Sequence, residues 1–197
     1  MNPPEDTEIL ALIGRLDHSE CAARERAATR IFAIGSERAQ TAAAEWFRDK
    51  DLASCFVGDA SGFPEATVGI AVNPDKFARI RLANDMPRLA DVPPDLDAEE
   101  FELRFAADVR LDVLTTRDRQ GNGAIARFLK KRGEGIQQVE LLVNDLDRAT
   151  NILRGQFGAA PVYAEGRRGA DETRVNFFLV ATPTSEKLLI ELVELPS

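Results

Sequence analysis

An internal repeat constrains the fold of this chain more than any other sequence feature. Residues 67–73 read TVGIAVN and residues 138–144 read QVELLVN, and a segment of helical pattern follows each run. Later in each copy, one acidic residue interrupts an apolar run, Asp112 in VRLDVL and Glu191 in LLIELV. Aliphatic and β-branched runs of this length are typical of strands. The sequence therefore predicts two similar halves, at about residues 64–121 and 133–197.

Each half has room for two more strands between its first and last strand. These runs lie near residues 88–92 and 101–105 in the first half, and near 161–164 and 174–180 in the second. We therefore predict an α+β fold, in which a pair of βαβββ modules forms a cup-shaped mixed sheet after a small all-α segment. The two acidic residues should lie opposite the apolar neighbours on their own strands, because side chains alternate across a strand.

The all-α segment covers residues 1–58, and residues 59–197 form the predicted sheet domain. The pattern LIGRL followed by RERAATRIFAIG resembles a HEAT-type repeat. Gly35 should end the second helix, and Ser36 should cap a third. Repeat units of this kind bury their apolar faces against neighbours. The helices are therefore expected to dock against the sheet domain or to form a dimer or partner surface.

The connection between the halves, residues 123–143, combines a short amphipathic helix, a hinge at Gly133 and Gly135, and a strand. The helix ends in the cations of residues 130–132, which oppose the negative end of the helix dipole. The alternative function for these cations is contact with the phosphates of a CoA-like ligand. The same alternative applies to three arginines of the second half: Arg167, Arg168 and Arg174.

Residues 64–197 resemble the vicinal oxygen chelate superfamily, and most closely its methylmalonyl-CoA epimerase family. The linker IARFLKKRGEGI, the strand TVGIAV and the segments RVNFFL and LLIELVE carry the resemblance. It implies a glyoxalase-like fold, a homodimer, and a divalent metal held by one residue from the first and last strand of each half. In this chain those positions are Thr67, Asp112, Gln138 and Glu191, where the epimerase pattern has His, Gln or Glu, His, and Glu.

Both histidine positions of the family pattern are lost, and the chain contains only one histidine, His18. Imidazole suits zinc, cobalt, nickel and iron, whereas oxygen ligands suit magnesium, calcium and manganese. We therefore expect no cofactor. The alternative is a divalent cation (Mn, Co or Mg) held by Asp112, Gln138 and Glu191. The resemblance also places Glu102 at the family's second acid–base position, so Glu191 and Glu102 are the catalytic candidates.

Two functions follow from these residues. The first is a glyoxalase-like protein with a degenerate metal site, which binds a small acyl or oxo-acid ligand or a protein partner without metal-dependent catalysis. The alternative is an isomerase or lyase of the epimerase kind, which uses a divalent cation or a carboxylate pair. Two neighbouring carboxyl groups raise the pKa of one of them, which can create an acid–base pair. The sequence therefore leaves open whether the protein is an enzyme.

Composition restricts the compartment and the partners. The net charge of -8 argues against a nucleic-acid partner, and no run approaches the about 18 apolar residues of a membrane-spanning helix. The first ten residues lack the apolar core of a signal peptide. Cys21 and Cys55 are too few for a disulfide framework, and free thiols fit a reducing compartment. We therefore expect a cytoplasmic homodimer with neither a nucleic-acid nor a membrane partner.

Overall fold

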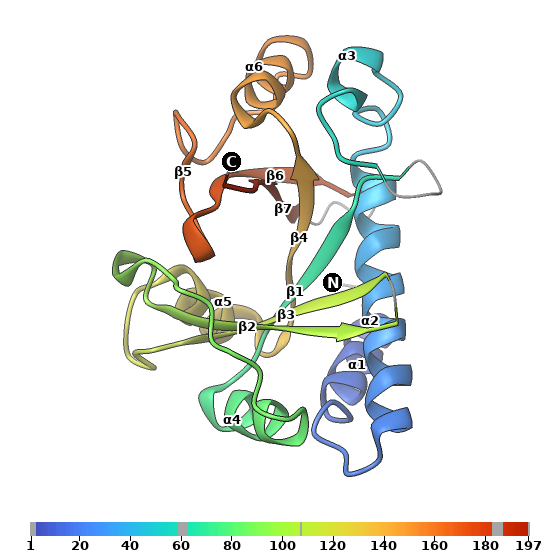
Figure 1. Cartoon of the computed structure of the whole chain (residues 1–197), viewed down its shortest axis with the longest axis vertical. Coiled ribbons are helices and arrows are strands. Elements are labelled where there is room, and N and C mark those ends of the chain that lie inside the picture. The colour runs from blue at the N-terminus through green and yellow to red at the C-terminus, as the bar shows by residue number, and fades with distance from the viewer. Residues whose placement is uncertain (1–2, 59–62, 107, 183–186, 197) are drawn as a thin grey trace. The chain divides into compact units, whose positions relative to one another are not determined.

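The computed structural model describes residues 3–58, 63–106, 108–182 and 187–196 (Figure 1). The chain forms two compact units. The first contains Met1–Gly35 and Thr67–Gln137, and the second contains Ser36–Ala66 and Gln138–Ser197. The N-terminal helical residues are thus divided between the two units. Residues 59–62, at the predicted domain boundary, lie outside the described residues.

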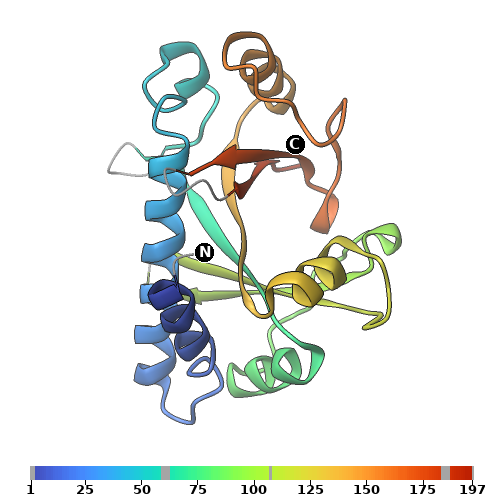
Figure 2. The same ribbon diagram turned by 180° about the vertical axis from the view of Figure 1, so that it is seen from behind.

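The first unit combines helices with three strands in the order β2-β3-β1, in which β1 runs parallel to β3 and β2 runs antiparallel to it. Figures 1 and 2 both show α1 beside the N-terminal part of α2. The elements are α1 (Pro3–Ile13), α2 (Cys21–Ala42, which continues into the second unit), β1 (Ala66–Ala71), α4 (Pro74–Ala83), η1 (Pro94–Leu96), β2 (Ala98–Phe105), β3 (Val109–Thr116) and α5 (Ala124–Arg132).

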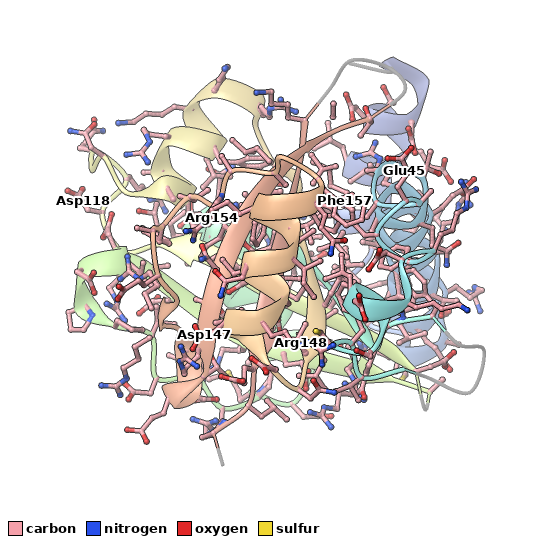
Figure 3. The ribbon with its side chains drawn as sticks, turned by 90° about the horizontal axis from the view of Figure 1, so that it is seen from above. Glu45, Asp118, Asp147, Arg148, Arg154 and Phe157 are labelled. Atoms are coloured by element: carbon pink, nitrogen blue, oxygen red, sulfur yellow. The ribbon has the colours of Figure 1, made fainter. Side chains whose placement is uncertain are left out.

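The second unit has four strands in the order β4-β7-β6-β5, in which β4 and β7 are parallel and the other pairs are antiparallel. Helix α6 lies over these strands, with Asp147 in its first turn and Phe157 at its end (Figure 3). The elements are α3 (Lys50–Ala53), β4 (Gly135–Val143, which begins in the first unit), α6 (Leu146–Gln156), β5 (Arg167–Arg168), η2 (Ala170–Glu172), β6 (Arg174–Ala181) and β7 (Lys187–Glu194).

The α+β class, with helical residues ahead of two related sheet units, is confirmed. The second of the four predicted strands differs from the prediction in both units. Residues 88–92 form no strand. They donate one backbone hydrogen bond to β2, from Ala90 N to Glu100 O, because the prolines around this run have no N–H to extend a ladder. Residues 161–164 pair with β6 only at the isolated bridge between Pro161 and Phe178, and the second strand of that unit is the two-residue β5.

Helix α2 is continuous, so the prediction that Gly35 ends a helix and Ser36 caps the next is wrong. The structure gives this glycine another role. A Cβ at Gly35 would lie 2.6 Å from Cγ2 of Val68 in β1, which is closer than packed atoms approach. Gly35 therefore allows the helix to pack directly on the strand.

The expected docking of the N-terminal helices on the sheet units is confirmed for each unit. In the first, Asn84 at the end of α4 donates to the carbonyl of Leu16 and accepts from Arg24. In the second, the ring of Trp46 meets that of Phe178 edge-on, with the ring centres 5.9 Å apart. The resemblance to HEAT repeats stays a prediction. Among the described helices, none is both long and apolar enough to cross a membrane.

Candidate functional site

The predicted site residues lie on strands of both units. Thr67, Asp112 and Glu102 lie on β1, β3 and β2 of the first unit, and Gln138 and Glu191 lie on β4 and β7 of the second. Both interrupting carboxylates face away from their apolar strand neighbours, as the alternation predicts. On the opposite face, the strand neighbours of the two carboxylates are fully buried: Leu111, Val113, Ile190 and Leu192. The polar face of each sheet is therefore the place where these residues can act.

In the first unit, the strand register brings Asp112 between Gly69 and Glu102. Thr67 lies one step further along the same face, two residues before Gly69. The side chain of Asp112 is buried, with 6% of its surface exposed. The carboxylate of Glu102 accepts a hydrogen bond from Arg104 Nε, which forms an ion pair with it. This face thus brings together two of the predicted carboxylates, and one of them is held by a guanidinium group.

In the second unit, the amide of Gln138 links two carboxylates. Its Nε2 donates to Glu191 Oε2 at 2.5 Å and to Glu140 Oε1 at 2.9 Å. Gln138 and Glu191 are buried, with 5% and 7% of their surface exposed. Glu140 and Glu191 are direct partners on the parallel strands β4 and β7. Like charges placed opposite each other repel, and the two N–H groups of the amide offset this repulsion.

Glu140 is a site residue that the sequence-based reasoning missed. It follows Gln138 by two positions on the same strand, and residues two apart share one face. That spacing was available in the sequence, since QVELL places Gln138 and Glu140 on one side and their apolar neighbours on the other. Together with the predicted nearness of Gln138 to Glu191, this spacing made an acid close to Glu191 predictable.

An aromatic and cationic group borders the carboxylates of the second unit. Phe177 on β6 is the direct strand partner of Glu191. The ring of Tyr163 meets that of Phe177 edge-on at 6.0 Å, and the guanidinium carbon of Arg167 lies 4.9 Å from the Tyr163 ring centre. Arg167 pairs with Val175, which shares a face with Phe177. We call Gln138, Glu140, Glu191, Phe177, Tyr163 and Arg167 the polar cluster.

Two of the basic residues suggested as phosphate contacts, Arg174 and Lys130, have local partners. Arg174 binds Asp147 and Glu194, each at 2.8 Å, and these hydrogen bonds raise the pKa of its guanidinium above the ordinary value. Asp147 is labelled in the first turn of α6 in Figure 3. Lys130, in the last turn of α5, donates to the carbonyls of Gln120 and Gly121, which lie before the helix. These contacts explain both side chains as structural.

The donor set does not fit the transition metal that the family pattern implies. The positions of its two imidazoles hold Thr67 and Gln138, and the amide hydrogens of Gln138 point at carboxylates. The ring nitrogen Nδ1 of His18 accepts from Glu20 N in a turn, and burial raises the pKa of the Cys55 thiol, which disfavours the thiolate. Within the described part of the chain, no three His, Cys, Asp or Glu side chains are grouped to hold a metal ion.

Solved structures of methylmalonyl-CoA epimerases are similar to this chain. The epimerase of Mycobacterium tuberculosis is 34% identical over 66% of this chain and 87% of that chain, with a TM-score of 0.54. A variant of the Streptomyces coelicolor epimerase in complex with 2-nitronate-propionyl-CoA is 22% identical over 68% of this chain and 98% of that chain, with a TM-score of 0.54. An epimerase in complex with methylmalonyl-CoA and NH4+ is 23% identical over 66% and 93%, with a TM-score of 0.53.

No protein-family model matches the chain, and no curated protein matches it. The two structures below 25% identity show the fold alone. The Mycobacterium tuberculosis enzyme shows more, because its identity is higher and most of its length is matched. The chain therefore belongs to the methylmalonyl-CoA epimerase family of the vicinal oxygen chelate superfamily.

Proposed function

We propose that the protein binds a small acyl or oxo-acid ligand on the polar face of its second unit, without metal-dependent catalysis. The observation that carries this proposal is the double hydrogen bond of Gln138. The family pattern has an imidazole at this position, and here a neutral amide donates to Glu140 and Glu191 instead. A carboxylate that accepts hydrogen bonds from an amide is stabilised in its charged form without a cation.

The proposed ligand chemistry follows from the polar cluster. Two carboxylates accept hydrogen bonds or a proton, the aromatic rings offer an apolar wall, and Arg167 supplies positive charge. A small acyl group with an adjacent carbonyl or carboxyl oxygen has parts that match each of these three features. The family relationship supports acyl thioesters as the first ligands to test.

The experiment combines two titrations of the full-length protein. Calorimetry with methylmalonyl-CoA should show saturable binding, whereas equilibrium dialysis with Co2+ or Zn2+ should show no stoichiometric uptake. Glu191→Ala serves as the control for the metal titration. Stoichiometric cobalt binding that this substitution abolishes would contradict the metal-independent part of the proposal. Absence of binding to methylmalonyl-CoA and to small 2-oxo acids would contradict the ligand-binding part.

The relationship to the Mycobacterium tuberculosis epimerase favours a second candidate function, isomerisation by proton transfer. The buried carboxylate of Glu191 would take the α-proton of an acyl thioester, and the electron pair of the broken C–H bond would move onto the thioester oxygen. Glu102 stays the candidate for the second acid–base residue. Incubation with methylmalonyl-CoA in deuterium oxide tests this candidate, because isomerisation requires exchange at the α-carbon. Exchange that Glu191→Gln abolishes would support it.

A cytoplasmic homodimer stays our proposal for the assembly, on the resemblance to the family. Light scattering of the purified protein at several concentrations measures its mass directly. A mass of twice 21.7 kDa would support the dimer, and a mass of one chain at all concentrations would contradict it.

A further inference from the structure

The second unit has a candidate for the positive group that a metal supplies in the family pattern. An anionic ligand oxygen next to Glu140 and Glu191 is unfavourable unless a cation or several donors offset the charge. The donor set of the metal positions does not fit a transition metal. A positive side chain on the same face of the same sheet is therefore the feature to examine.

Arg167 lies on that face. In the register of β5 and β6 it pairs with Val175, which is buried and lies two residues before Phe177. Phe177 in turn is the strand partner of Glu191. The side chains of Arg167, Val175, Phe177 and Glu191 therefore share one face of the second unit.

The ring of Tyr163 supports the guanidinium of Arg167. The 4.9 Å separation between the guanidinium carbon and the ring centre is typical of a cation–π contact. Tyr163 is itself held by its edge contact with Phe177 and by a hydrogen bond from its N–H to the side chain of Asn176, which is buried. A guanidinium stacked in this way loses little further freedom when it binds a planar oxyanion, and it presents paired N–H donors.

The neighbouring arginines do not share this placement. Arg168 follows Arg167 on the two-residue strand and therefore points to the opposite face, where its guanidinium lies 3.4 Å from Glu172. Arg174 is on that opposite face as well and binds Asp147 and Glu194. Of these three arginines, only Arg167 has the carboxylates of the polar cluster on its side of the sheet.

We propose that Arg167 is the anchoring residue for an anionic oxygen of the ligand, and that it takes the place of the family's metal ion in this chain. This inference rests on the proposed function, and it narrows the ligand to acyl thioesters or oxo acids that carry a planar oxyanion. The guanidinium binds the oxyanion through two parallel N–H donors. Glu140 and Glu191 then face the adjacent carbon or hydroxyl rather than the charged group.

The test compares two thioesters and two arginines in the full-length protein. 2-nitronate-propionyl-CoA, the compound bound by the Streptomyces coelicolor epimerase, carries a planar anionic group, and propionyl-CoA lacks that group. Arg167→Met should weaken the binding of the nitronate compound by about 10- to 100-fold, as expected for loss of a charge-assisted bidentate contact. It should weaken the binding of propionyl-CoA by less than about 3-fold.

Arg168→Met is the matched control, since it removes the same charge from the next residue. It should leave both affinities within about 2-fold of the original protein. Arg167→Lys keeps the charge without the planar fork and should give an intermediate loss. Circular dichroism and thermal unfolding of each variant show whether it is folded. If Arg167→Met does not fold, Arg167→Lys provides the test.

The outcomes separate this inference from the proposed function. If the unaltered protein binds neither thioester nor small 2-oxo acids, the proposed function fails and this inference falls with it. If the unaltered protein binds the nitronate compound and Arg167→Met binds it equally well, only the anchoring role of Arg167 is overturned. Equal losses for Arg167→Met and Arg168→Met would also overturn it, because a general effect of charge would then explain both.

Discussion

The two units place a buried carboxylate in corresponding last strands but surround it differently. In the first unit, Asp112 lies between Gly69 and Glu102 in the strand register. In the second, Glu191 lies between Glu140 and Phe177, and the amide of Gln138 donates to both carboxylates. The two units therefore share the position of the acid but not the residues around it. The chemistry of each face therefore depends on those neighbours.

The apolar faces differ in their cover. In the first unit, α2 packs on β1 where Gly35 meets Val68. In the second, α6 and the Trp46 side chain lie against the sheet, and Trp46 contacts Phe178. The contact with the sheet uses the smallest residue, in helix α2, in one unit and the largest residue, in the turn after α2, in the other.

Trp46→Ala should cause the largest loss of stability. Trp46 is buried, with 5% of its surface exposed, and it contacts the fully buried Phe178. Truncation of a buried tryptophan leaves a cavity and should lower the free energy of unfolding by about 3–5 kcal/mol. Urea denaturation followed by circular dichroism measures this change. A loss below about 1 kcal/mol would show that residues 36–66 contribute little to the core of the second unit.

Gln138→Leu and Gln137→Leu should differ although the two residues are adjacent. The first substitution removes the donor shared by Glu140 and Glu191 and should cost about 1–3 kcal/mol of unfolding free energy. The second removes an oxygen, Gln137 Oε1, that is buried and has no hydrogen-bond partner among the described residues. It should therefore be neutral or stabilising. Equal losses in urea denaturation would show that the two carboxylates do not depend on the amide.

Gly35→Ala and Gly155→Ala should have opposite signs. Both glycines lie inside helices, where alanine is intrinsically better by about 0.5–1 kcal/mol. A Cβ at Gly35 meets the branched side chain of buried Val68, so this change should cost about 1–3 kcal/mol. A Cβ at Gly155 meets nothing within 4 Å, so that change should stabilise. Stabilisation by both, measured as shifts in the midpoint of thermal unfolding, would contradict the close contact.

Asp17→Asn should have the smallest effect, and the effect should depend on pH. Burial raises the pKa of Asp17, but the hydrogen bond from Arg79 and the charge of Lys76 lower it by more. Because the pKa is lowered in the folded state, the charged carboxylate of Asp17 stabilises the fold at pH values above 3.8, the ordinary pKa. This contribution is lost as the pH falls through the folded pKa. The substitution should therefore cost up to about 1 kcal/mol at neutral pH and almost nothing in acid.

The exposed pair of Glu8 and Arg30 provides the control for this comparison. Glu8→Gln should leave the unfolding free energy almost unchanged at every pH, because exposed pairs are screened by water. Urea denaturation of both variants at several pH values distinguishes the two cases. A constant difference for Asp17→Asn down to low pH would contradict the role of its charge.

The apolar runs allowed three of the four strands in each repeat to be predicted, and strand alternation allowed the facing of Asp112 and Glu191 to be predicted. Gly35 was misassigned because glycine marks both helix ends and close contacts, and only the position of Val68 separates these roles. The side of the sheet on which Arg167 lies could not be predicted. Its strand is two residues long, so its facing depends on the register with β6, which no local pattern determines.

Three elements, α2, β1 and β4, each run without a break from one compact unit into the other. Each unit is consequently assembled from an early and a late part of the chain, in interleaved order. Removal of residues 1–58 would strip helical cover from both units at once, and cleavage within β4 would separate the late part of the second unit from its early part, residues 36–66. Expression of single repeats is therefore a poor route to dissecting this protein, and point substitutions in the whole chain are the suitable tool.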